Sequence, residues 1–244
     1  IHLVYHSSGE IYYTKSVNNG STWSAPVNLT NNPALSLHPS LAIDASNDLH
    51  LVYEEYNTCW EVFYRKSIGG VFSGTAAKLS GGNDAVTPVA TIDANGKIHL
   101  VYTEYSAGSS EIIYRQFNGS WTTPLNISNS AGLSYSPSIV TDSNNDIHLA
   151  WVEDELTPGN GQILYRRTLS GAWQMGVINV SNTSGHSIAP CLVSDADNNQ
   201  HLVWENYASA GEILYKKQTG GVFSGSAMNL SNNSGNSCSP SISA

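Results

Sequence analysis

Charge is scarce in this sequence. Lys and Arg together number 10, Asp and Glu 19, and charged residues make up 12% of the 244 residues, with a net charge of −9. Such a chain lacks the basic clusters that supply most of the affinity for a phosphate backbone. We therefore expect no nucleic-acid partner.

Long hydrophobic runs are also missing. No stretch approaches the roughly 20 consecutive apolar residues that a membrane-spanning helix requires, so we expect no membrane span. No charged-then-apolar leader is present, and the chain opens on a strand-like run rather than on Met. We expect a mature or excised piece of an exported protein, extracellular or on the cell surface, and eight Asn-x-Ser/Thr sequons agree with that expectation.

Cysteine is scarce as well. Cys59, Cys191 and Cys238 lie far apart in the sequence and match neither a metal-ligand spacing nor a disulfide framework. We expect buried or idle thiols, no metal and no cofactor. Calcium binding stays open, although no sequence motif supports it.

One pattern, repeated five times, dominates what is present. A run of the type Ile-His-Leu-Val-Tyr recurs with periods of 48, 49, 49 and 53 residues, and it starts at Ile1, Leu49, Ile98, Ile147 and Gln200. A Glu-Ile-x-Tyr run, an Asn-Leu-Ser run and a Pro-Ser run follow it in register. These runs are rich in β-branched and aromatic residues, which indicates four strands per repeat and no helix.

The prolines order the strands within a repeat. Proline cannot donate a hydrogen bond to a sheet, so it belongs on an edge strand. The Pro-Ser run is therefore expected to be the innermost strand of a four-stranded antiparallel blade. It contains Pro39, Pro88, Pro137, Pro190 and Pro240.

We predict an all-β fold, a single five-bladed β-propeller that occupies residues 1–244. The segment Cys238–Ala244 is expected to pair with the first strand of the chain and close the ring, which would remove an exposed sheet edge. Repeats 1 to 5 denote the predicted blades: 1–36 plus 237–244, 37–85, 86–134, 135–187 and 188–236.

One turn carries a family resemblance. Its residues are Ser16, Asn18, Gly20, Thr22 and Trp23, within Ser16-Val-Asn-Asn-Gly-Ser-Thr-Trp23. The turn resembles the Asp-box of sialidase-type (BNR) propellers, Ser-x-Asp-x-Gly-x-Thr-Trp, with Asn18 at the Asp position. The resemblance implies a propeller fold, in which this turn is a folding element far from the active face.

The sequence departs from the sialidases of that superfamily. Those enzymes have six blades and hold the substrate carboxylate with three arginines. Here Arg65, Arg115 and Arg166 recur at one position after the tyrosine of the Glu-Ile-x-Tyr run, and such repetition is typical of a structural role. We therefore expect a sialidase-like fold without the sialidase catalytic residues.

The repeated histidines invite a metal interpretation, but each belongs to a different blade. We expect them to pack or hydrogen-bond between blades, while Asp44, Asp93, Asp142 and Asp195 cap the preceding turns. The histidines are His2, His50, His99, His148 and His201.

The loops that follow the His-Leu-Val strands are acidic and aromatic. Their acids are Glu54, Glu55, Glu104, Glu153, Asp154, Glu155 and Glu205, joined by Asp84 from a linker. Their face contains no Lys or Arg, so it should reject anionic ligands such as sialic acid. Carboxylates beside aromatic rings suit the hydroxyls and C–H faces of neutral sugars. The expected ligand-binding residues are Glu55, Tyr56, Trp60, Glu104, Tyr105, Tyr135, Glu153, Glu205 and Tyr207.

Three functions remain open at this point. The leading prediction is a monomeric, non-catalytic, lectin-like module that binds a glycan. The second is a surface scaffold for a protein ligand, such as one with a basic patch. The third is a divergent glycoside hydrolase, which would need two carboxyl groups about 5 to 10 Å apart. The innermost strands carry no carboxylate, so we expect no catalytic residue.

Overall fold

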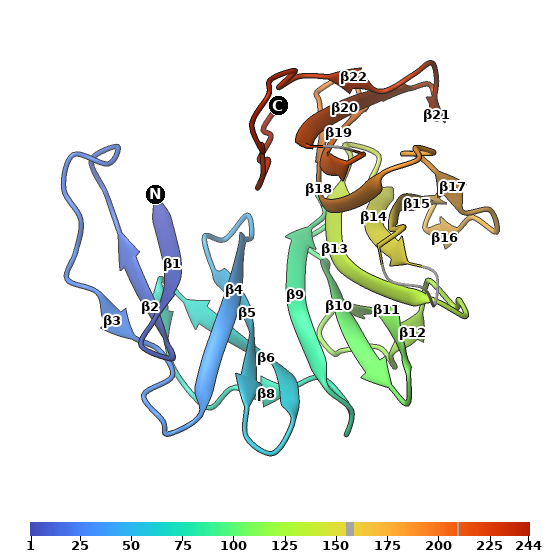
Figure 1. Ribbon diagram of the computed structural model, residues 1–244. Coiled ribbons are helices and arrows are strands. Elements are labelled where there is room, and N and C mark those ends of the chain that lie inside the picture. Colours follow the sequence, from blue (N-terminus) through green and yellow to red (C-terminus); the bar gives the residue numbers. More distant parts are fainter. Residues whose placement is uncertain (155–158, 209) are drawn as a thin grey trace.

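The computed structural model describes residues 1–154, 159–208 and 210–244, and every regular element in these ranges is a β-strand (Figure 1). Repeat 1 contains β1 (His2–Ser7), β2 (Glu10–Lys15) and β3 (Val27–Asn28). Repeat 2 contains β4 (Leu35–Ile43), β5 (Leu49–Tyr56), β6 (Trp60–Ile68), β7 (Val71–Phe72) and β8 (Ala77–Lys78). Repeat 3 contains β9 (Ala85–Ile92), β10 (Ile98–Ser106), β11 (Ser109–Phe117) and β12 (Leu125–Asn126).

The last two repeats follow the same order. Repeat 4 contains β13 (Leu133–Thr141), β14 (Ile147–Asp154), β15 (Gln162–Leu169), β16 (Ala172–Trp173) and β17 (Ile178–Asn179). Repeat 5 contains β18 (His186–Ser194), β19 (Gln200–Tyr207), β20 (Gly211–Thr219), β21 (Val222–Phe223) and β22 (Met228–Asn229). The long strands of each repeat are antiparallel neighbours, as the sequence predicts.

Hydrogen bonding joins the strands into four sheets rather than five separate blades. Repeats 3 and 4 share one nine-stranded sheet, because Ser110 of β11 pairs in parallel with Leu133 of β13. The outer strand of repeats 2, 4 and 5 is split into two short pieces. In repeats 2 and 5 a left-handed glycine lies between the pieces, Gly74 at φ 77° and Gly225 at φ 70°, a conformation that glycine adopts without steric cost.

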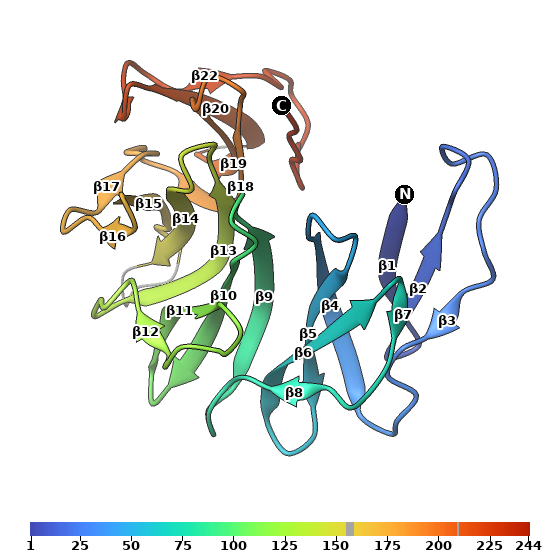
Figure 2. The same ribbon diagram turned by 180° about the vertical axis from the view of Figure 1, so that it is seen from behind.

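The chain ends differ from the expectation. Within the described residues, β1 pairs only with β2, and 237–244 forms no strand, so the arc of repeats is open between its two ends (Figure 2). The C-terminal segment is instead held against repeat 5. The Ser237 N–H donates to the Gly211 carbonyl at 2.7 Å, and the Ser239 N–H donates to the Glu205 carboxylate at 2.6 Å. These bonds fix the segment without bringing it to β1.

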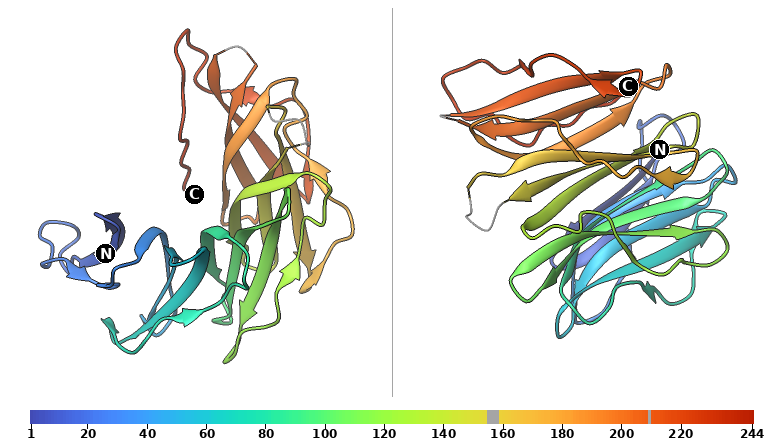
Figure 3. Two further views of the ribbon diagram at one scale, coloured as in Figure 1. Left: turned by 60° about the horizontal axis from the view of Figure 1, so that its bottom comes forward. Right: turned by 90° about the vertical axis from the view of Figure 1, so that its right-hand side faces the viewer.

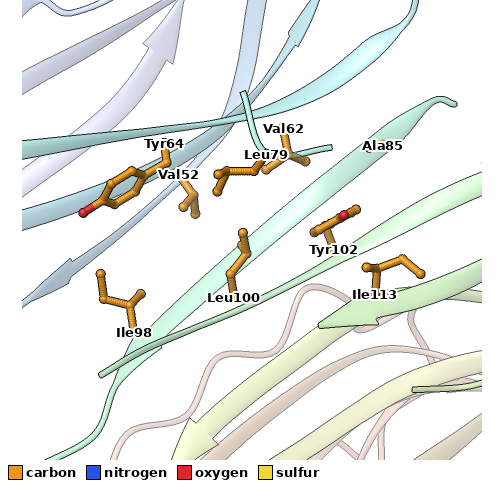
Figure 4. Packing of buried hydrophobic residues seen from close by; sticks show 9 residues of the cluster. All are labelled: Val52, Val62, Tyr64, Leu79, Ala85, Ile98, Leu100, Tyr102 and Ile113. Atoms are coloured by element: carbon orange, nitrogen blue, oxygen red, sulfur yellow. The ribbon is translucent and has the colours of Figure 1, made fainter. Parts of the chain in front are cut away.

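The hydrophobic core lies between consecutive repeats, and each of the four clusters joins one neighbouring pair. Figure 4 shows the cluster between repeats 2 and 3, where Leu100 and Tyr102 of β10 meet Val52 and Val62 of repeat 2. All four side chains are fully buried or nearly so. Burial of an aliphatic side chain contributes about 1.5 to 3 kcal/mol, so these contacts hold successive repeats together.

The two ends of the arc expose positions that are buried everywhere else. Leu3 of β1 is 46% exposed, whereas its equivalents Leu51 and Leu100 are completely buried. Leu230 of repeat 5 is 53% exposed, whereas its equivalent Val180 is completely buried. Both end faces are apolar and have no neighbouring repeat in the described structure (Figure 3).

The repeated histidines form their hydrogen bonds within their own repeat rather than between repeats, which corrects the hydrogen-bond half of the expectation. His50 Nδ1 lies 2.8 Å from the Tyr64 hydroxyl, and its Nε2 lies 3.2 Å from Asp44. The His–Tyr pair recurs in all five repeats, and an Asp lies within 4 Å of the histidine in repeats 2 to 5. The predicted turn caps are confirmed, since the Ser46 N–H donates to Asp44 at 2.9 Å.

The repeated arginines tie each repeat to the preceding one, which confirms their structural role. Arg65 and Arg115 donate to the carbonyls of Leu29 and Leu79. Arg166 Nη1 donates to the Ile127 carbonyl at 2.8 Å. Lys216 occupies the same position in repeat 5 and reaches the Val180 carbonyl at 3.3 Å. These cations are therefore not free to bind a ligand anion.

The turn that resembles an Asp-box is closed by its own side chains. The Thr22 N–H donates to Asn18 Oδ1 at 2.9 Å, and the Gly20 N–H donates to the Ser16 hydroxyl at 2.8 Å. Asn18 serves at the Asp position because the turn needs an acceptor oxygen, which an amide also supplies. Trp23 follows the turn and is 44% exposed on the end face of repeat 1.

Candidate functional site

The C-terminal ends of β5, β10 and β19 expose tyrosines on one face of the arc. Tyr56 is 45% exposed, Tyr105 44% and Tyr207 37%, while Trp60 and Tyr135 are half-buried. Tyr56 packs against Trp60 with ring centroids 5.3 Å apart. The structure therefore places the predicted aromatic residues on one face, and it leaves Tyr105 free of such a ring partner among the described residues.

The predicted carboxylates are less accessible than the aromatics. Glu55 is 7% exposed and accepts hydrogen bonds from Asn32 Nδ2 at 2.8 Å and from the Ser36 hydroxyl at 3.1 Å. Glu153 accepts a bond from the Ser134 hydroxyl at 2.6 Å. Both carboxylates fix the segment that leads into the innermost strand. Glu104 is half-exposed, whereas Glu155 lies outside the described residues.

A hollow of about 460 Å³ opens beside Tyr105. This loop-face hollow is lined by Cys59, Gly82, Asn83, Asp84, Tyr105, Ser106, Ala107, Gly108, Ser109 and Leu133. Its wall is fixed by Asp84, whose backbone carbonyl accepts from the Tyr105 N–H and whose carboxylate accepts from the Trp60 N–H, both at 2.7 Å. The volume falls in the range of small-molecule sites.

The lining of the loop-face hollow combines polar and apolar surface, and among the described residues it carries no Lys or Arg. Asn83 and Ser109 supply both donors and acceptors, and Asp84 supplies acceptors. Tyr105 adds an aromatic wall. An anion would find no cation to pair with in this hollow, whereas a hydroxyl-rich neutral ligand would find both kinds of partner.

The tyrosines of this face keep their phenol protons. Burial, followed by the charge of Glu54, raises the pKa of Tyr105. Burial, then Asp154 and Tyr105, raises the pKa of Tyr135 to about 12. The hydrogen bond to Glu205 raises the pKa of Tyr207. Each phenol therefore stays a neutral hydrogen-bond donor at physiological pH.

Glu54, near the C-terminal end of β5, forms a pair with His38 that the sequence did not predict. The repeat pattern grouped Glu54 with exposed loop acids, but Glu54 is 3% exposed. Its carboxylate lies 2.8 Å from His38 Nδ1 and accepts the Thr87 N–H at 2.5 Å. His6 lies edge-on to His38, with ring centroids 6.0 Å apart. A signal was available, because position 54 varies among the repeats while the position before it is always Tyr or Trp.

Glu205 occupies the position equivalent to Glu54. It is 5% exposed, and besides the bond from the Ser239 N–H it accepts one from the Tyr207 hydroxyl at 2.7 Å. Two carboxylates therefore do reach the inner strands, from the neighbouring strand rather than from the Pro-Ser run. Each of these carboxylates has two hydrogen-bond partners.

Across 1–154, 159–208 and 210–244, no three His, Cys, Asp or Glu side chains are grouped to hold a metal ion. The described part of the chain contains no helix that could cross a membrane. Cys59, Cys191 and Cys238 are free thiols.

Comparison with known proteins adds fold information. No protein-family model and no curated protein sequence matches the chain. A protein of unknown function from Dyadobacter fermentans is similar in structure, with a TM-score of 0.64, 12% identity, and coverage of 93% of this chain and 73% of that one. An ulvan lyase of polysaccharide lyase family PL25 gives a TM-score of 0.65 and 15% identity over 91% of this chain and 62% of the lyase.

A sialidase is also among the similar structures. The intramolecular trans-sialidase of Ruminococcus gnavus gives a TM-score of 0.58 and 15% identity over 86% of this chain and 50% of the enzyme. The chain thus spans less than two thirds of the lyase and of the trans-sialidase. These likenesses define an all-β, propeller-like fold related in structure to sialidases and to other carbohydrate-active enzymes.

Proposed function

We propose that the chain is a non-catalytic, lectin-like module that binds a neutral saccharide in the loop-face hollow. The observation that carries the proposal is a monosaccharide-sized hollow with an exposed tyrosine, polar groups of both kinds and no cation. Fold alone does not define function, but the structural neighbours include a polysaccharide lyase and a trans-sialidase, which makes a carbohydrate ligand the natural first choice.

The binding mode follows from the chemistry of the lining. Tyr105 stacks on the apolar C–H face of the sugar ring. Asn83, Asp84 and Ser109 exchange hydrogen bonds with its hydroxyls. On a longer glycan, further rings extend along the same face toward the remaining predicted residues, of which Tyr56 and Tyr207 are the most exposed.

The fold underlying this proposal is one five-bladed ring. The C-terminal segment contacts repeat 5 in the same two ways in which an innermost strand contacts the preceding repeat. The Ser237 N–H donates to the Gly211 carbonyl, as the Ser36 N–H donates to the Gly9 carbonyl. The Ser239 N–H donates to the Glu205 carboxylate, as the Thr87 N–H donates to the Glu54 carboxylate. These contacts support the proposal that the segment forms the innermost strand of repeat 1 when the ring closes. Closure would cover both apolar end faces in an exported, monomeric module.

A second function has one observation in its favour. A protein ligand with a basic patch would suit the net charge of −9 and the acidic loops. Such an interaction would weaken steeply as salt is added, whereas binding of a neutral sugar would not. The glycosidase alternative is disfavoured, because Glu54 and Glu205 are each occupied by two hydrogen-bond donors.

The test is titration with methyl glycosides of glucose, galactose and mannose, followed by ¹H–¹⁵N NMR. Amide shifts at Gly108 and Ser109 are expected for at least one sugar, and Tyr105→Ala is expected to abolish them. Tyr56→Ala is the matched control, since Tyr56 is equally exposed but lies outside the hollow. The absence of shifts with every glycoside would refute the saccharide proposal.

A further inference from the structure

A second hollow lies on the opposite side of the arc, between repeats 3 and 4. This opposite-face hollow has a volume of about 390 Å³. It is built from turns at the far ends of the same strands that form the loop face. Its lining comprises Asp93, Asn95, Lys97, His99, Tyr114, Gln116, Leu125, Asn144, Asn145, Ile147, Ser170, Gly171 and Trp173.

A break in the repeat coincides with this hollow. The equivalents of Gln116 in the other repeats are long cations: Lys15, Lys66, Arg167 and Lys217. The Arg167 guanidinium packs so closely on Gly221 of repeat 5 that a β-carbon there would lie 2.5 Å from Nη2. At Gly171, the equivalent of Gly221 beside Gln116, a β-carbon would meet no atom within 4 Å.

Two of the other cations are also engaged. Lys66 lies 3.0 Å from Asp48 and Lys217 lies 3.5 Å from Asp195, so each is held against the turn of its own repeat. Gln116 is shorter and neutral, and its Oε1 accepts only a 3.3 Å bond from the Tyr114 hydroxyl. The opposite-face hollow is therefore the counterpart of the space that Arg167 fills beside Gly221.

The lining chemistry fits a polar, uncharged ligand. Gln116, Asn95 and Asn144 present amides with both donors and acceptors, and the opposite charges of Lys97 and Asp93 leave the lining without a net charge. The half-buried Trp173 and the exposed Leu125 give apolar surface for a sugar C–H face. One lining group also lacks a hydrogen bond in the described residues: Nε2 of the buried His99, 3.4 Å from Asp93.

We propose that the opposite-face hollow is a second binding site for a neutral, monosaccharide-sized ligand, so that one chain holds two sugars on opposite faces. This inference rests on the proposed saccharide function. Two sites that point in opposite directions cannot cooperate on one short glycan. They link two glycans instead, and on a surface carrying many glycans the gain comes through multivalency.

The experiment follows the Trp173 indole N–H by NMR during the same methyl glycoside titrations, with the resonance assigned through Trp173→Phe. In the wild-type chain the indole signal is expected to shift along with the amides of Gly108 and Ser109. Gln116→Arg introduces the side chain that repeat 4 carries and fills the hollow. It is expected to weaken the Trp173 response about tenfold or more and to leave the Gly108 and Ser109 response unchanged.

A charge-matched control distinguishes the effect of filling the hollow from the effect of adding a positive charge. Asn118→Arg places the same cation on the exposed turn after β11, outside the hollow, and should alter neither response. Shifts at Gly108 and Ser109 without any at Trp173 would overturn the second site and leave the proposed function standing. A Trp173 shift that survives Gln116→Arg unchanged would also overturn it. Silence at both places would overturn the proposed function and this inference together.

Discussion

Truncation of Leu3 distinguishes a closed ring from an open arc. In a closed ring the end face of repeat 1 packs against repeat 5, so Leu3 becomes as buried as Leu100, which is completely buried in the core between repeats 2 and 3. Leu-to-Ala changes at buried sites lower the free energy of unfolding by about 2 to 5 kcal/mol, because transfer and cavity terms add. In an open arc Leu3 stays 46% exposed, and its truncation costs only about 1 kcal/mol.

The assay is urea unfolding of Leu3→Ala, Leu230→Ala and the reference Leu100→Ala, with the midpoint and slope measured separately. Closure predicts that both end variants lose stability comparable to the reference variant. Losses of about 1 kcal/mol or less at both ends, together with a full loss in Leu100→Ala, would refute the closed ring. If every variant keeps the wild-type slope of unfolding free energy against urea concentration, the substitutions change stability rather than the extent of unfolding.

Two further predictions concern the folding elements. Burial lowers the pKa of His50, His99 and His148 below the ordinary 6.5, so the unfolded chain binds protons that the folded chain does not. The thermal midpoint should therefore hold steady above pH 6.5 and fall as the pH drops below it; a midpoint that rises on acidification would contradict this assignment. Arg166→Met removes the bond to the Ile127 carbonyl and should lower the free energy of unfolding by about 1 to 3 kcal/mol, as measured in urea; an unchanged midpoint would show that this tie contributes nothing.

Most of the fold was predictable because it repeats. Five copies of one pattern predicted the strands and their order, and the recurrence of Arg at one position in three copies predicted a structural role for it. The hydrogen-bond partners of the histidines were not predictable in the same way. The pattern shows that His50 recurs, but whether it turns toward its own Tyr64 or toward a neighbouring repeat depends on the side-chain direction in the folded sheet.

The candidate site was harder to predict because it depends on departures from the repeat. Exposed tyrosines such as Tyr105 could be placed on one face from strand direction alone. The burial of Glu55 and Glu54 could not, since it depends on where Asn32 and Thr87 fall in three dimensions. Gln116 was visible in the sequence as the one neutral residue among cations, but its consequence, an unfilled space beside Gly171, required the structure.

A glycan-array screen of the purified chain tests the central claim most directly. It should include the wild type and Tyr105→Ala, each with calcium and with a chelator. The account predicts binding of the wild type to neutral glycans in both conditions, loss of that binding in Tyr105→Ala, and no enrichment of sialylated glycans. A blank array, or binding that Tyr105→Ala leaves intact, would contradict the assignment of the loop-face hollow as a saccharide site.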